Sequence, residues 1–304
     1  MTTGLVIVLT FFLHANETGS ARADLPDIQA VPQDLYPPPV TEGTPAPGRR
    51  VRQTESEYRT SLVYHTLYLP TDWKPNQTFP VIVEYPGNGP YRSPFGDVCT
   101  GEIEDCHLGY GISGGQGFIW LCLPFVSKDH QHNQTQWWGD ISATADYCKQ
   151  AVREVCAQHG GDPSAVILAG FSRGAIACNF IGLHDDAIAG LWLAFIAHSH
   201  YDGVRQWDYP GSDRAPALER LKRLHGRPQF ISHEGSTDET RTYLETACPD
   251  GRFTFQSLPY RNHTDTWVLR NIPERQAVRA WLQTVLRERS PGAKPTRDND
   301  SRQR

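Results

Sequence analysis

Ser172 is the residue of this sequence best placed for nucleophilic chemistry. It lies in residues 166–177, where an aliphatic strand pattern is followed by a G-x-S-x-G turn and a helix start of small residues. Glycine is needed on both sides of such a serine because a side chain there would clash with the neighbouring strand or helix. The serine then stands at a helix N-terminus, whose backbone N–H groups stabilise an oxyanion formed on an attacked carbonyl. The pattern predicts acyl transfer to Ser172.

This strand–turn–helix pattern resembles the nucleophile elbow of the α/β-hydrolase superfamily, and the resemblance extends over about residues 58–289. It implies a mostly parallel central sheet with helices on both faces. It also implies that an acid and a histidine follow the serine in that order, each after a later strand. Apolar runs predict these later strands at residues 189–197, 227–232 and 253–258.

Two residues match the acid and the histidine in this order. Asp238 follows the strand at 227–232, and His263 follows the strand at 253–258. We expect His263 to take the proton of Ser172 and Asp238 to orient the imidazole and stabilise its charged form. Asp202 is the alternative acid, because some members of the superfamily place their acid after the preceding strand.

An oxyanion hole needs a second backbone donor from the loop after an earlier central strand, expected at 80–85. Residues 68–89 resemble the entry of the secreted esterase and prolyl-oligopeptidase-like branches, which usually carry His-Gly where this chain has Pro86-Gly87. The resemblance implies that the amides of Asn88 and Arg173 hold the oxyanion. The Arg173 side chain has three interpretations: added charge at the oxyanion, as in the glucuronoyl esterase branch, recognition of an acidic substrate, or a salt bridge on the first helical turn.

The loop at 128–140 precedes an expected helix at 141–159 and overhangs the same rim. Its tandem Trp137 and Trp138 suit stacking on a sugar ring or an aromatic acyl group. The alternative is that one indole packs under the helix, and we expect one in each role.

The segment His198-Ser199-His200-Tyr201-Asp202 permits a different chemistry. It resembles the H-x-H-x-D pattern of zinc hydrolases, although the histidine that usually follows the aspartate is missing. We expect His200 to line the substrate pocket instead, with neither metal nor cofactor needed. A binding protein that kept the fold and lost its chemistry is disfavoured, because serine, acid and histidine are all present.

Composition predicts the organisation of the chain. Residues 1–23 read as a signal peptide with an A-x-A cleavage pattern, and 24–50 as a proline-rich disordered linker. The catalytic domain is expected at 51–289 and a polar, disordered tail at 290–304. The protein is therefore expected to be secreted or periplasmic. Seven cysteines in an exported chain suggest disulfides, with Cys99 and Cys106 the easiest pair.

A net charge of −5 without a basic stripe argues against nucleic acid as a partner, and no segment after the signal is expected to enter a membrane. The sequence thus predicts a secreted serine hydrolase that acts on carbohydrate-linked or aryl esters. A serine peptidase of prolyl-oligopeptidase type is the alternative, disfavoured because the chain has no room for an N-terminal propeller.

Overall fold

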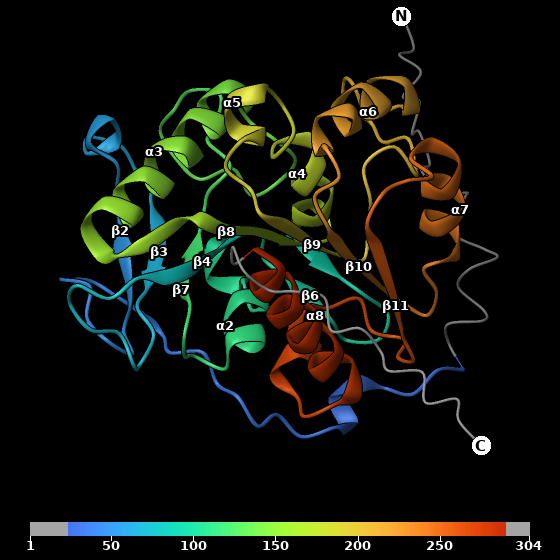
Figure 1. Ribbon diagram of the computed structural model, residues 1–304, viewed down its shortest axis with the longest axis horizontal. Helices are drawn as coiled ribbons and strands as arrows, with labels where there is room; N and C mark the ends of the chain where they lie inside the picture. Colours follow the sequence, from blue (N-terminus) through green and yellow to red (C-terminus); the bar gives the residue numbers. More distant parts are fainter. Residues whose placement is uncertain (1–23, 290–304) are drawn as a thin grey trace, which may run out of the picture.

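The computed structural model describes residues 24–289, so the predicted signal peptide at 1–23 and the tail at 290–304 lie outside the described residues. Within this range the chain folds around a nine-stranded sheet, with helices on both faces (Figure 1). The strand order is β1-β2-β3-β7-β4-β8-β9-β10-β11. The pairs β2–β3 and β3–β7 are antiparallel and all other neighbours in this sheet are parallel, which confirms the predicted fold class.

The strands of this sheet alternate between two cores, as strands covered on both faces must. Val81 and Val83 face one core while Ile82, between them, faces the other. The long helix α3 covers the first core and α2 and α8 cover the second (Figure 1). The sheet strands are β1 (Val40–Thr41), β2 (Arg50–Gln53), β3 (His65–Tyr68), β4 (Phe79–Tyr85), β7 (Ile119–Cys122), β8 (Gly161–Phe171), β9 (Ala194–His198), β10 (Gln229–Glu234) and β11 (Phe253–Leu258).

A separate two-stranded hairpin, β5 (Tyr91–Arg92) with β6 (Val98–Cys99), follows β4. The helices are α2 (Leu108–Ser113), α3 (Ile141–His159), α4 (Arg173–Phe180), α5 (Asp186–Ala189), α6 (Arg214–Leu221), α7 (Asp238–Ala247) and α8 (Pro273–Arg289), with short 3₁₀ turns η1 (Ile28–Ala30), η2 (Ser56–Tyr58), η3 (Ile103–Asp105), η4 (Lys222–Leu224) and η5 (Thr266–Leu269). None of the helices within residues 24–289 is long and apolar enough to cross a membrane.

The predicted strand at 189–197 begins later than expected. The short helix α5 occupies its first residue, because the Asp185 side chain accepts a hydrogen bond from the N–H of Ile188 and caps a helical turn there. The strand β9 therefore starts at Ala194.

Residues 24–50 were predicted to be a disordered linker, and the structure corrects this. Ile28 is buried against the second core, and its N–H donates to Asn262 Oδ1 at 2.8 Å. Asp34 forms a paired ion bridge with Arg275 of α8, with both nitrogen–oxygen distances 2.6 Å. The segment runs along the molecule beside α8 (Figure 1). These partners lie more than two hundred residues away in sequence, so the local proline-rich composition gave no sign of them.

The expected disulfide between Cys99 and Cys106 is absent, and all seven cysteines are free thiols. The Cys106 thiol lies instead beside Cys122 at the end of β7, with their sulfur atoms within 4.8 Å of each other and of a Glu84 oxygen. Proximity in sequence was therefore a poor guide to pairing: both cysteines are buried in the second core, with the turn η3 between them, and neither is bonded to the other.

Candidate active site

Ser172 occupies the sharp turn between β8 and α4. Its backbone has φ 54° and ψ −113°, a conformation that a non-glycine residue adopts only at a cost. No other residue fits at the two flanking positions, Gly170 and Gly174, because a Cβ at either would clash with the backbone. A Cβ at Gly170 would lie 2.1 Å from the carbonyl oxygen of Gly174, and a Cβ at Gly174 would lie 2.1 Å from that of Tyr85. The predicted elbow is thus present, and close packing explains its two glycines.

Three side chains from different strand ends meet at this turn. His263, in the loop after β11, has its Nε2 3.1 Å from Ser172 Oγ and its Nδ1 2.6 Å from Glu234 Oε1. Glu234 is the last residue of β10. The parallel register places the ends of β8, β9, β10 and β11 side by side, which brings these residues to one edge of the sheet. The arrangement is that of a nucleophile, a base and a buried acid.

The prediction that Asp238 orients His263 is wrong. Asp238 is exposed in the first turn of α7, where a carboxylate favours the positive end of the helix dipole. The strand β10 extends through Glu234, so the carboxylate that reaches the imidazole comes from the strand end itself. Asp202, the alternative acid, accepts two hydrogen bonds from Arg220 at 2.7 and 2.9 Å and is equally excluded.

Charge complementarity keeps Glu234 ionised. Burial alone would raise the pKa of this carboxyl, but the neighbouring His263 and its hydrogen bond hold the pKa well below its usual range. A buried carboxylate next to the imidazole stabilises the positive charge that the imidazole gains on accepting a proton.

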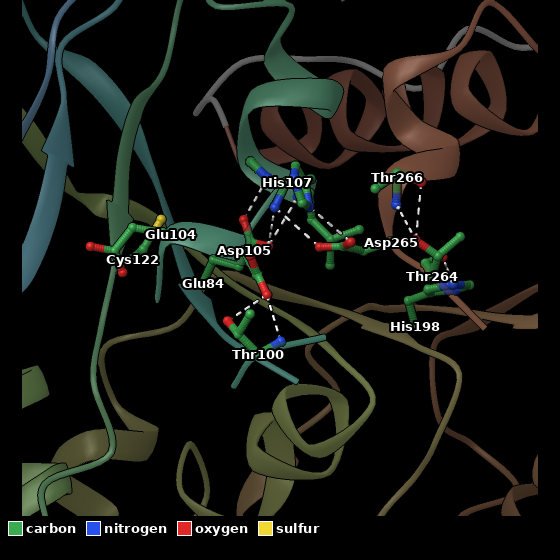
Figure 2. A network of polar contacts seen from close by, with 12 residues as sticks. Glu84, Thr100, Glu104, Asp105, His107, Cys122, His198, Thr264, Asp265 and Thr266 are labelled. Atoms are coloured by element: carbon green, nitrogen blue, oxygen red, sulfur yellow. Dashed lines mark hydrogen bonds and ion pairs between the residues drawn. The ribbon is translucent and has the colours of Figure 1, made fainter. Parts of the chain in front are cut away.

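The loop carrying His263 is fixed by several hydrogen bonds. Asp97 accepts from the His263 N–H and the Asn262 side chain, each at 2.9 Å. Asp265 Oδ1 lies 2.9 Å from His107 Nδ1, at the start of α2. Burial alone would lower the pKa of His107, but the Asp265 carboxylate raises it. Figure 2 shows this pair beside Glu84, which accepts from the N–H groups of His107, Leu108 and Gly109 at 2.7–3.0 Å.

His198 belongs to the same supporting network and not to a zinc site. Its Nδ1 lies 3.0 Å from Ser232 Oγ and its Nε2 lies 3.0 Å from the carbonyl oxygen of Thr264 (Figure 2). Both nitrogens are therefore engaged, and Asp202 is held by Arg220. The alternative metal site at His198, His200 and Asp202 does not form.

Asn88 and Arg173 line the same cavity as Ser172, as the residues of an oxyanion hole must. Arg173 begins α4, where the first helical N–H groups have no acceptor within the helix. The Asn88 side chain accepts from the Trp137 N–H at 2.8 Å, which fixes the loop. A Cβ at Gly87 would lie 2.9 Å from the Cys99 sulfur, which explains the glycine at this position of the loop.

The Arg173 side chain is 1% exposed, so its guanidinium is not open to a substrate in the cavity, and it forms no salt bridge with the residues that the structure describes. It donates to the carbonyl oxygens of Gln134, Trp137 and Gly101 at 2.8–3.2 Å and lies over the Phe125 ring. Arg173 thus ties the rim loops to the elbow, a structural role that only the tertiary contacts reveal.

A cavity of about 820 Å³ opens over Ser172, and tryptophan, tyrosine and histidine side chains are among the residues that line it. Trp137 and His200 line it, whereas Trp138 is buried and stacks on Phe180 with ring centroids 4.4 Å apart. One indole thus lines the cavity and the other packs in the core, one in each role as expected, and Trp138 is not among the candidate substrate contacts. Burial holds the pKa of His200 well below its usual range, so His200 is neutral at neutral pH. Tyr91, Ser199 and Trp207 are among the lining residues that sequence reasoning missed.

Comparisons with known proteins agree with this fold. No family model matches the chain, and no curated protein matches it. Among solved structures it is similar to esterase 2 of Thermogutta terrifontis, phosphorylated by paraoxon (TM-score 0.52, 14% identity, covering 77% of this chain and 91% of that one). It is also similar to a sugar hydrolase from Lactococcus lactis (TM-score 0.50, 13% identity, 80% and 100%).

A thermostable esterase is matched with a TM-score of 0.48 and 13% identity over 77% of this chain, which spans 62% of that protein's length. The sheet, the elbow turn and the similarities to the Thermogutta terrifontis and Lactococcus lactis proteins define an α/β-hydrolase fold. At such low identities they establish the fold alone.

Proposed function

We propose that the protein is a serine carboxylic-ester hydrolase that uses Ser172, His263 and Glu234. The observation that carries the proposal is the chain of contacts from Ser172 Oγ to His263 Nε2 at 3.1 Å and from His263 Nδ1 to Glu234 at 2.6 Å. Ser172 attacks the ester carbonyl as His263 takes its proton, and His263 returns that proton to the leaving alcohol. Water then hydrolyses the acyl-enzyme by the same route. The backbone amides of Asn88 and Arg173 stabilise the oxyanion during both acylation and deacylation.

The shape of the cavity supports esters that carry a ring. Aromatic side chains form a continuous wall from the base outward: the His263 and His200 ring centroids are 5.3 Å apart, those of His200 and Trp207 5.2 Å, and those of Trp207 and Trp137 5.5 Å. Flat aromatic faces bind aryl groups and the apolar faces of sugars at low entropic cost. We therefore propose that the substrates are aryl or carbohydrate-linked esters. We also propose that the protein is exported, because residues 5–13 form the apolar run of a signal peptide.

The test begins with covalent labelling of the nucleophile. A fluorophosphonate probe is expected to label the wild-type protein at Ser172, and Ser172→Ala should abolish both labelling and ester hydrolysis. Ser236→Ala is the matched control, because Ser236 lines the same cavity and should retain both. Turnover that survives Ser172→Ala and is lost on chelation of metals would overturn the serine mechanism.

The substrate class is tested with a panel of p-nitrophenyl acetate, aryl esters, acetylated xylan and a chromogenic dipeptide amide. Higher kcat/KM on ring-bearing esters than on the acetate is expected. A preference for the dipeptide amide would show a peptidase instead.

A further inference from the structure

Ser199 contacts the acid and the base of the proposed triad at once. Its Oγ lies 3.2 Å from Glu234 Oε1 and 2.9 Å from His263 Nδ1. The shortest contact of the three atoms joins His263 Nδ1 to Glu234 Oε1 at 2.6 Å, so the Nδ1 proton is donated to the carboxylate. The hydroxyl proton of Ser199 then has Glu234 Oε1 as its acceptor. One carboxylate oxygen therefore receives two donors.

The backbone of Ser199 is unfavourable for a residue with a side chain. Its φ is 89°, a value that favours glycine, and it directly follows the end of β9. The N–H of Ser199 donates to the carbonyl oxygen of Ser232 at 2.8 Å, which holds the residue against β10. Backbone strain of this kind gathers at functional sites. Two further non-glycine residues with positive φ, Ser172 and Trp137, line the same cavity.

We propose that Ser199 is a positioning residue for the proposed triad. Its hydroxyl fixes the oxygen of Glu234 that holds His263, so that Nε2 faces Ser172 Oγ. No proton passes through Ser199 during turnover, because the His263 Nδ1 proton stays on the imidazole when Nε2 accepts the proton of Ser172. The inference rests on the proposed hydrolase function and adds a fourth residue to its machinery.

Two variants that remove the same hydroxyl separate positioning from stability. Ser199→Ala keeps a Cβ atom on the strained backbone, whereas Ser199→Gly removes the Cβ and relieves the strain. We expect both to lower kcat about tenfold or more with little change in KM, the loss typical of a deleted hydrogen bond to a charged group. Ser199→Gly should nevertheless have a higher Tm than Ser199→Ala, the reverse of the usual order of these residues.

The pH profile of kcat/KM provides a readout that a purely structural role would not move. Without the hydroxyl, more of the Glu234 charge stabilises the protonated imidazole, so the acid limb should shift to higher pH. The other titratable groups around the pair are unchanged in these variants: His198 on β9, His233 on β10, His200 in the loop after β9, Asp97 at the His263 backbone and Tyr91, whose ring contacts that of His263. The NMR resonance of the His263 Nδ1 proton should also move, and this signal is independent of turnover.

His225 offers a matched control. It is exposed at the end of η4 with φ 48° and ψ 43°. His225→Gly should be more stable than His225→Ala, with wild-type activity in both. Wild-type kcat, pH profile and Nδ1 resonance in both Ser199 variants would overturn the proposal, as would an activity loss confined to the less stable one. Failure of wild-type protein to react with the fluorophosphonate would instead overturn the hydrolase function.

Discussion

At the scale of single residues, the identity of the acid decides how the site works. Glu234 is 1% exposed and lies at the end of a central strand, where its carboxylate contacts His263 directly. Asp238 is exposed on α7. The two carboxylates are close in sequence, yet only Glu234 is buried beside the imidazole, and burial makes its charge effective.

Exchange of these two carboxylates for amides tests the assignment. Glu234→Gln should lower kcat by about 10³–10⁴, because the imidazole loses its charge partner and its tautomer is no longer fixed. Asp238→Asn, the matched control, should retain nearly full activity. The measurement is kcat on a single aryl ester, with circular dichroism to confirm folding. A crippled Asp238→Asn variant beside an active Glu234→Gln variant would reverse the assignment.

At the scale of elements, two loops build the cavity over Ser172. The loop after β7 contributes Trp137, and the loop after β9 contributes His200, Val204 and Trp207. Each loop is anchored from within the fold. Arg173 binds the carbonyl oxygen of Trp137 in the first, and Arg220 of α6 binds Asp202 in the second. These contacts anchor both loops within the fold, and a wall that is already in place lowers the entropic cost of binding the proposed substrate.

Trp137→Ala tests whether this wall binds the ring of the substrate. We expect a higher KM for aryl or saccharide esters, equivalent to a loss of about 1 kcal/mol of binding free energy, and little change in the KM for p-nitrophenyl acetate. Trp138→Ala is the comparison, because its indole packs in the core, and it should lower the free energy of unfolding by about 3–5 kcal/mol. Equal effects of Trp137→Ala on long and short esters would contradict a ring-binding role.

At the scale of the whole molecule, buried titratable groups make the free energy of unfolding depend on pH. His65 on β3 is buried, and its Nδ1 lies 2.9 Å from the Tyr147 hydroxyl of α3. Burial lowers the pKa of His65 to about 3. The unfolded chain, with an ordinary histidine, takes up a proton below about pH 6.5 while the folded chain does not. The stability that neutral His65 contributes is therefore complete above about pH 6.5 and is lost as the pH falls toward the folded pKa.

His65→Gln should remove this dependence. Between about pH 6.5 and pH 5 the wild-type protein should lose about 2 kcal/mol of unfolding free energy that the variant keeps. Urea unfolding of both proteins at several pH values measures the difference. Parallel curves for the two proteins over this range would show that His65 titrates normally in the folded state.

The amino-acid sequence by itself determined the features that depend on local backbone chemistry. The elbow at Ser172 was predictable, because its two glycines are demanded by contacts within a few residues and with one adjacent strand. The helix α3 and the strand β11 have the predicted bounds, since each is a continuous periodic pattern between clear ends. The position of His263 followed from the order of these elements.

The tertiary structure decided which side chains meet. Glu234 and Asp238 flank the same short turn. Because β10 extends to Glu234, the carboxylate of Glu234 and not that of Asp238 contacts His263. The neighbouring sequence gives no sign of the roles of Ser199 and Trp207. Ser199 contacts Glu234 of β10 and His263 after β11, and Trp207 contacts Trp137, so both roles depend on segments distant in sequence. The same holds for residues 24–50, whose order rests on Asn262 and Arg275 at the far end of the chain. Local sequence fixes backbone conformation, whereas contacts between distant segments depend on how the whole sheet assembles.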